Sequence, residues 1–240
     1  MSTHTVVATI NTMSFRFKQF FVEDNRCAMK VGTDGVLLGA WCPIPYTIRH
    51  TPYTILDIGT GSGLIARMLM QRCPEAKVEG IDIDEAAVEQ ATENGVNAFC
   101  SRLQDWQGGP YDLIVSNPPY FQNSLKNPDK GRQTARHTDT LSYEELIKHS
   151  VRLLTPNGQL ALILPAEAEK EVRGLAAAEM LSLTHVTRVF GKESKPAKRV
   201  LMSFQQSAIS CQPTEDSLVL ENEIGGRSAA YQELCKDFYL

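Results

Sequence analysis

The residues best suited to chemistry form a tetrapeptide, Asn117-Pro118-Pro119-Tyr120, directly after the apolar run Tyr111 to Ser116. The two prolines remove two ladder donors and fix two φ angles, so a strand must stop here and the chain must turn stiffly. An amide side chain and a phenol are left at the carboxyl end of the strand, where open α/β sheets bind ligands. An acceptor beside an aromatic face suits a flat group that carries an NH2. An ordinary strand-terminating turn is the alternative.

A glycine loop lies upstream of this turn. The run Ile55 to Ile58 predicts a short buried strand, and Gly59-Thr60-Gly61-Ser62-Gly63 leads from it into a helical stretch that begins at Leu64. Glycines at alternate positions let a backbone turn tightly and approach a ligand without interference from Cβ atoms. A second strand ends in Asp82, about 20 residues further on, which is the place of an acid that binds ribose hydroxyls. Together with the proline turn, these features favour a ligand site over unrelated turns.

These residues resemble the motif set of class I S-adenosylmethionine-dependent methyltransferases that act on amino or amide nitrogen. The matching motifs are Asp57-x-Gly59-x-Gly61-x-Gly63, Asp82 and the tetrapeptide at 117–120. The resemblance implies an α/β, Rossmann-like fold: a mostly parallel twisted sheet with a final antiparallel strand, inserted beside the fifth strand, and helices on both faces. It also implies S-adenosyl-L-methionine as the cofactor, with no metal.

Two flanking segments narrow the resemblance. Met29 to Trp41 and Arg132 to His137, together with Phe20 to Val22, are similar to the bacterial tRNA (adenine-37-N6)-methyltransferases that modify valine tRNA. This resemblance covers residues 10 to 205. It implies methyl transfer to the exocyclic N6 amino group of an adenine in RNA, most specifically adenosine 37 in the anticodon loop of valine tRNA.

The proline corner is expected to carry the catalysis. Methyl transfer is an in-line displacement, in which positioning does most of the work. If the Asn117 side-chain oxygen and the Pro118 carbonyl each accept one N–H, the lone pair of the amino group is released toward the methyl group. Developing positive charge would strengthen both bonds in the transition state. Pro119 stiffens the corner, and Tyr120 is expected to stack on the base.

The cofactor is expected to lie between the glycine loop and the ends of the strands. Asp82 should bind the ribose hydroxyls, Ile83 should pack on the adenine ring, and the three loop glycines should pass close to the methionine portion. Asp57 should orient the loop or receive the ammonium group through water. The resemblance places Thr33 and Asp34 beside the methionine end, although a simple helix cap is the alternative for this pair.

The adenine end departs from the family pattern. Many relatives place an Asp after the fourth strand to hold the exocyclic amine, and here either Arg102 or Asp105 occupies that place, depending on the alignment. We expect contacts from Leu103 and Asp105.

RNA contact is expected from two basic loops. One loop follows the proline turn, and the other, Gly191 to Arg199, joins the last two predicted strands, which a short loop restricts to antiparallel pairing. Cations flanking one pocket would hold phosphates while a base is extruded. Solvated surface charge is the alternative. The candidate residues are Arg132, Arg136, His137, Lys192, Lys195, Lys198 and Arg199.

Length and composition set the wider limits. The chain has 240 residues and a net charge of −4, so RNA binding must come from a local patch rather than from the whole protein. Six scattered cysteines without a C-x-x-C pair argue against zinc and fit a reducing cytoplasm. No apolar stretch reaches membrane-spanning length. The sequence does not indicate the oligomeric state, and a monomer is assumed.

Three regions are expected along the chain. Residues 1–50 should form an N-terminal hairpin and a short helix, and residues 51–206 the methyltransferase domain. Within this domain, Asn94-Gly95 predicts the end of one helix, Ser142 to Glu145 predicts a capping box that opens another, and Ala166 to Leu181 predicts a further helix. Residues 207–240 should be an extension packed on the same domain, with a short strand at Leu218 to Leu220 and a terminal helix.

Four other functions compete with RNA methylation. A DNA adenine methyltransferase is disfavoured because the sequence shows no added target-recognition domain. A protein glutamine-amide N-methyltransferase would use the same proline corner, and the basic loops argue against it. A non-catalytic S-adenosylmethionine-binding module would have no need of Asn117. A nicotinamide-dependent oxidoreductase is disfavoured because Leu64 stands where its third glycine is required.

Overall fold

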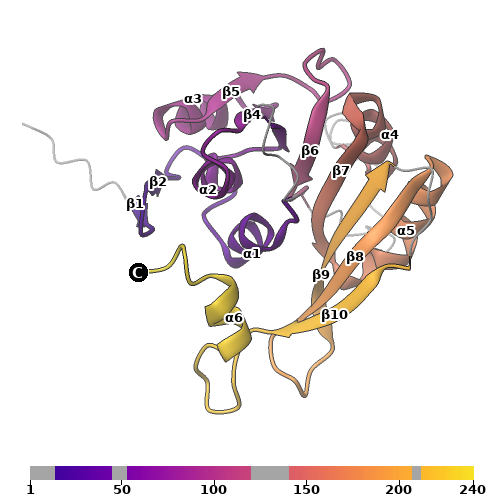
Figure 1. Cartoon of the computed structure of the whole chain (residues 1–240). Helices are drawn as coiled ribbons and strands as arrows, with labels where there is room; N and C mark the ends of the chain where they lie inside the picture. Colours follow the sequence, from indigo (N-terminus) through magenta and orange to yellow (C-terminus); the bar gives the residue numbers. More distant parts are fainter. Residues whose placement is uncertain (1–13, 45–52, 120–140, 207–211) are drawn as a thin grey trace, which may run out of the picture.

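The computed structural model describes residues 14–44, 53–119, 141–206 and 212–240. Its centre is an eight-stranded sheet with the order β10-β8-β9-β7-β6-β3-β4-β5 (Figure 1). All neighbours are parallel except β9, which runs antiparallel to both β7 and β8. The strands are β3 (Thr54–Ile58), β4 (Lys77–Asp82), β5 (Asn97–Cys100), β6 (Tyr111–Ser116), β7 (Leu154–Pro165), β8 (Leu181–Phe190), β9 (Ala197–Gln206) and β10 (Thr214–Val219).

The predicted fold class, a mostly parallel sheet with a late antiparallel strand, is confirmed. The late antiparallel strand β9 lies beside β7, as the resemblance implied. The predicted short strand near Leu218 is longer than expected, and it pairs with β8 in parallel at the edge of the sheet.

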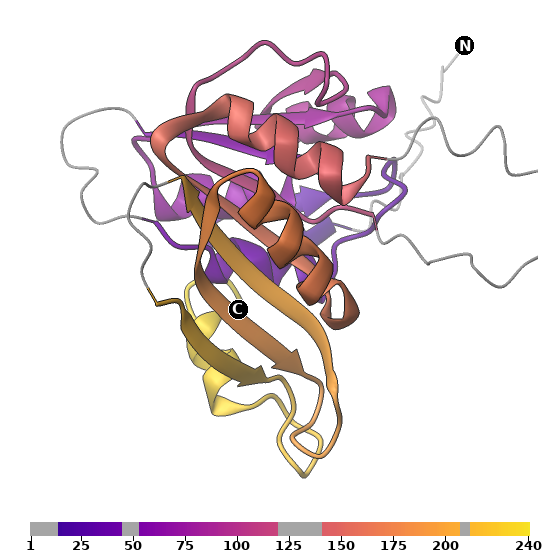
Figure 2. The same ribbon diagram turned by 90° about the vertical axis from the view of Figure 1, so that its right-hand side faces the viewer.

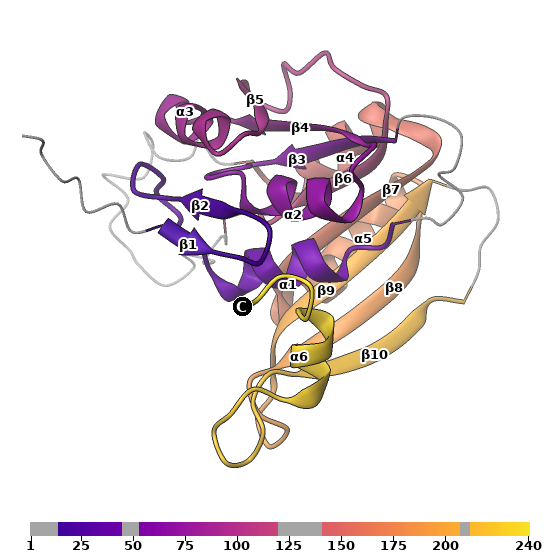
Figure 3. The same ribbon diagram turned by 60° about the vertical axis from the view of Figure 1, so that its left-hand side comes forward.

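Helices cover both faces of the sheet (Figures 2 and 3). One hydrophobic core joins the sheet to α1, α2, α3 and α6, and a second joins it to α4 and α5. Neighbouring residues of one strand, such as Leu113 and Ile114 of β6, enter different cores because side chains alternate across a sheet. The helices are α1 (Thr33–Trp41), α2 (Leu64–Arg72), α3 (Glu85–Glu93), α4 (Tyr143–Leu153), α5 (Glu169–Ala178) and α6 (Ala229–Leu234).

Local sequence signals account for several boundaries. Ser142 and Glu145 form a capping box at the start of α4, and Gly95, with φ of 86°, follows the end of α3. In contrast, the predicted helix from Ala166 to Leu181 is divided into a 3-10 turn, η1 (Ala166–Ala168), and the shorter α5. None of the helices in the described ranges has the length and apolar content that a membrane crossing requires.

Two glycines of α1 fix its position against α2. A Cβ atom at Gly35 would lie 2.9 Å from Leu64 Cδ2, and one at Gly39 would lie 2.6 Å from Met68 Sδ. The helices can therefore approach closely only because these side chains are absent. This contact places the first turn of α1 beside the glycine loop.

Both ends of the described chain meet near α1. The N-terminal hairpin pairs β1 (Ser14–Arg16) with β2 (Phe21–Glu23), and the backbone N–H of Lys18 donates to the carbonyl of Phe238 at 2.8 Å. Tyr231, Cys235 and Phe238 are buried in the same core as α1. The division at residues 50/51 and 206/207 falls beside segments outside the described residues and stays a prediction.

Candidate active site

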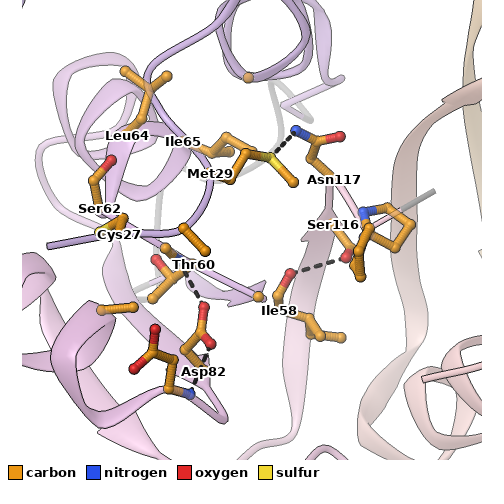
Figure 4. A pocket seen from close by; sticks show the side chains of 18 of the residues that line it. Cys27, Met29, Ile58, Thr60, Ser62, Leu64, Ile65, Asp82, Ser116 and Asn117 are labelled. Atoms are coloured by element: carbon orange, nitrogen blue, oxygen red, sulfur yellow. Dashed lines mark hydrogen bonds between the residues drawn. The ribbon is translucent and has the colours of Figure 1, made fainter. Parts of the chain in front are cut away.

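A cavity of about 740 Å³ opens at the carboxyl edge of the sheet (Figure 4). Its walls come from the glycine loop, the end of β4, the proline corner after β6, and the segment that runs from Cys27 into α1. The turn after β5, from Ser101 to Gln104, adds a fifth wall, so five segments of the chain meet at one place. The volume lies in the range of small-molecule sites.

The three loop glycines have different roles. Gly59 and Gly61 have φ of 69° and 54°, and a Cβ atom on either would meet nothing within 4 Å. Both line the cavity, so their backbone is open to a ligand. Gly63, with φ of 80°, is outside the cavity lining, and its Cβ would lie 2.7 Å from Val96 Cγ2. Its absent side chain serves helix packing.

Asp82 lies in the cavity wall at the end of β4. Its Oδ2 accepts the Gly61 N–H at 2.9 Å, and its Oδ1 accepts the Asp84 N–H at 3.0 Å. The carboxylate is therefore held in place by the loop that it faces. Ile83 follows it in the lining with 59% of its surface exposed, which makes an apolar wall for a flat ring.

Asp57 is fully buried and is not part of the cavity lining. Its Oδ2 accepts the Thr60 hydroxyl at 2.8 Å and the Ala66 N–H at 3.2 Å. Burial raises the pKa of this carboxyl to about 7. The arrangement suits the predicted role of orienting the loop better than that of receiving an ammonium group.

The proline corner forms the opposite wall. Asn117, Pro118 and Pro119 all line the cavity, and the Ser116 hydroxyl donates to the Ile58 carbonyl at 2.9 Å, which ties β6 to β3. The Asn117 Nδ2 group donates to Met29 Sδ at 3.6 Å (Figure 4). Tyr120, the predicted stacking residue, lies outside the described residues.

Thr33 and Asp34 line the cavity from the first turn of α1. The helix begins after Gly32 without a side-chain cap, so the alternative that this pair is a simple helix cap is wrong. Asp34 Oδ2 accepts Arg199 Nε at 2.9 Å. Arg199, expected to contact RNA, is thus paired with a cavity carboxylate.

The part of the cavity that was predicted to hold the adenine does not include the acid Asp105 in its lining. Leu103 is buried and lines the cavity, together with Arg102 and Gln104, but Asp105 is exposed and is not part of the lining. A helical turn, in which the Trp106 N–H donates to the Arg102 carbonyl at 3.1 Å, accounts for this difference. The expectation that Asp105 would help to line the site is not met, and sequence reasoning missed Gln104.

The other RNA candidates divide into two groups. Pairing of Arg199 with Pro165 at the end of β7 places the start of β9 at the same edge as the proline corner. Lys195 and Lys198 are exposed, whereas Lys192 Nζ lies 3.8 Å from Glu221 Oε2. Arg132, Arg136 and His137 lie outside the described residues.

The polar groups and the apolar walls of the cavity fit the parts of S-adenosylmethionine. Asp82 offers acceptor oxygens for a ribose, Ile83 and Leu103 offer apolar surface for a base, and the open backbone at Gly59 and Gly61 leaves room for an amino-acid tail. Met29, which sequence reasoning did not single out, stands next to Asn117 on the far side.

Comparison with known proteins agrees with this geometry. The family model described as "Methyltransferase small domain" matches residues 46–187. A Bacteroides fragilis protein named tRNA1(Val) (adenine(37)-N6)-methyltransferase is 43% identical over 238 residues, which cover 94% of this chain and 97% of the relative. A Parabacteroides distasonis protein of the same name is 44% identical, with the same coverage of both chains.

Solved structures support the fold. A predicted O-methyltransferase from Agrobacterium tumefaciens superposes with a TM-score of 0.65 at 15% identity, over 85% of this chain and 96% of the other. Sequence and fold therefore lead to one conclusion: the chain belongs to the family of the tRNA1(Val) (adenine(37)-N6)-methyltransferases, within the methyltransferase small domain group.

Proposed function

We propose that this protein transfers a methyl group from S-adenosylmethionine to the N6 amino group of an adenine in tRNA, specifically adenosine 37 of valine tRNA. The observation that carries the proposal is that one cavity holds both the open glycine loop with Asp82 and the Asn117-Pro118 corner. The names of relatives at 43–44% identity supply the substrate. We propose that the protein acts in the cytoplasm.

S-adenosylmethionine, when bound, supplies an electrophilic methyl group on a sulfonium. Asp82 would hold the ribose, and Ile83 and Leu103 the base. Thr33 and Asp34 would lie beside the amino-acid end, where the Asp34 carboxylate suits an ammonium group and Arg199 fixes that carboxylate. These residues would bind and orient the cofactor. The residues of the opposite wall would bind the amino group that reacts.

Asn117 and Pro118 would prepare the nucleophile. An adenine amino group shares its lone pair with the ring, so it is a weak nucleophile. Hydrogen bonds that hold its two N–H groups in a suitable orientation release the lone pair from this conjugation. The Asn117 side-chain oxygen and the Pro118 carbonyl would each accept one N–H. Both bonds strengthen as nitrogen becomes positive, which lowers the barrier rather than only improving binding. Tyr120 remains the predicted stacking platform.

Valine tRNA made in vitro, with the purified protein and S-adenosylmethionine, tests the proposal. We expect N6-methyladenosine at position 37 in nucleoside mass spectra, and none in a transcript with guanosine at that position. Asn117→Ala should abolish turnover and leave binding of S-adenosylhomocysteine unchanged. Asn157→Ala, an exposed control in β7, should behave as wild type. Equal loss of turnover and binding in Asn117→Ala would assign the corner a structural role only.

A further inference from the structure

Met29 is a cavity-lining side chain that contacts the amide of Asn117. The two residues are separated by 88 positions, and Asn117 Nδ2 lies 3.6 Å from Met29 Sδ. Figure 4 shows the nitrogen of Asn117 turned toward the sulfur and the oxygen on the side away from it. Met29 retains 47% of its surface exposed, so it stands at the cavity surface and not in the core.

The chemistry of Met29 and Asn117 favours one orientation of the Asn117 carboxamide. A carboxamide has a donating end and an accepting end, which exchange when the group turns by half a rotation. A thioether sulfur is an acceptor only, although a weak one. Met29 therefore favours the orientation in which the NH2 group faces the sulfur and the oxygen points to the other side. The opposite orientation would present an NH2 group to a target NH2 group.

The segment that carries Met29 is anchored well enough to serve this purpose. Asp24 Oδ2 accepts the Val31 N–H at 2.7 Å, which closes the loop around Met29. The buried Asn94 side chain donates to the carbonyls of Glu23 at 2.7 Å and Ser62 at 2.8 Å. The loop is thus tied to the glycine loop on the other side of the cavity.

We infer that Met29 is a positioning residue, which fixes the Asn117 carboxamide so that its oxygen accepts from the target amino group. The inference rests on the proposed function, since it gives Asn117 the acceptor role stated there. It adds a second element to selectivity: the sulfur makes the corner an acceptor site, suited to an amino group and unsuited to a ring carbonyl.

The test replaces the sulfur with a group of similar shape. Met29→Leu should lower the single-turnover rate of tRNA methylation about two- to fourfold, the low end of the usual worth of one hydrogen bond because a thioether is a weak acceptor, with S-adenosylhomocysteine affinity unchanged. It should also shift the side-chain NH2 signals of Asn117 in protein labelled with 15N-asparagine, which Asn117→Asp identifies by their loss. Met180→Leu, the same change at a site 82% exposed and outside the cavity lining, should alter none of these.

A second arm separates positioning from packing. In Asn117→Asp, which has no NH2 end to orient, Met29→Leu should cause no further loss of the residual rate. The same loss in both backgrounds, unmoved NH2 signals, or an equal fall in S-adenosylhomocysteine affinity would each overturn the inference. The NMR arm needs no RNA, so it still reports on the Met29–Asn117 contact if the wild-type protein fails to methylate tRNA.

Discussion

Asp82 uses both carboxylate oxygens on backbone N–H groups, those of Gly61 and Asp84. Such a carboxylate is oriented before a ligand arrives, which reduces the entropy lost on binding. Asp82→Asn replaces one acceptor oxygen with a donor and removes the charge. We expect the Kd of S-adenosylhomocysteine, measured by calorimetry, to rise about 10- to 100-fold, as for loss of a charged hydrogen bond. Asp105→Asn, at an exposed acid outside the cavity lining, is the matched control and should leave the Kd unchanged. An equal rise in Kd for the two variants would indicate that Asp105 also belongs to the cofactor site.

Asp57 gives the protein a defined pH dependence. Burial raises its pKa from 3.8 to about 7, so the folded protein keeps this proton to a higher pH than the unfolded chain. Stability from this group is fully present below the lower value and is lost as the pH rises through the upper one. Wild type should therefore lose stability relative to Asp57→Asn between these values, by at most about 1.4 kcal/mol per pH unit. Denaturant unfolding without cofactor measures the difference. Parallel curves would contradict the prediction.

Single residues also mark the limit of sequence reasoning at the site. Asp82 and Asn117 could be placed because each ends a strand, and strand ends of a parallel sheet share one edge. Gln104 could not be placed, because the turn at Arg102 to Trp106 decides which side chains face the cavity. Met29 was inside a segment that carried the family resemblance, but its contact with Asn117 depends on the packing of α1.

At the scale of elements, the glycine loop separates binding from packing. Gly63→Ala places a Cβ 2.7 Å from Val96 Cγ2 at φ of 80°, and we expect a loss of about 2–5 kcal/mol in the free energy of unfolding. Gly61→Ala, with nothing within 4 Å, should lose only about 1–2 kcal/mol. In return, Gly61→Ala should weaken S-adenosylhomocysteine binding more, because Gly61 lines the cavity. Denaturant unfolding and calorimetry on both variants test whether Gly63→Ala loses more stability and Gly61→Ala loses more binding affinity. Equal losses in both assays would refute the division of roles.

Elements with strong local signals were predictable, and those that depend on distant partners were not. The capping box at Ser142 and the glycine after α3 lie in short stretches of sequence, and both predictions are confirmed. The length of β10 was not predictable, because its residues become a strand by pairing with the exposed edge of β8. The 3-10 turn that shortens α5 gave no sequence signal.

At the scale of the whole molecule, the β8–β9 hairpin forms an arm. Near its loop end the hairpin is joined to the cavity through Arg199 and Asp34, and the loop itself lies at the lower end of the molecule in Figure 2. Lys195→Gln with Lys198→Gln should weaken tRNA binding and reduce the slope of log affinity against log salt by about one to two. Filter binding at several salt concentrations measures this slope. Lys148→Gln, an exposed lysine of α4, is the control. An unchanged slope would remove the arm from the RNA interface.

The sheet order also shows what a family resemblance adds to local patterns. Alternating strands and helices predict a parallel sheet, but they do not tell where β9 inserts. The resemblance placed β9 beside β7, and the register confirms it. The sequence predicted that residues 207–240 pack on the same domain, but it did not predict that Phe238 is buried in the core of α1.

The contact between Lys18 and Phe238 has a consequence for synthesis on the ribosome. A nascent chain that has already produced α1, the glycine loop and the proline corner still lacks Tyr231, Cys235 and Phe238, which cover α1. The core that supports α1 is completed only after translation has passed these late positions. Prematurely terminated products would thus carry every catalytic motif and still leave this part of the core of α1 uncovered.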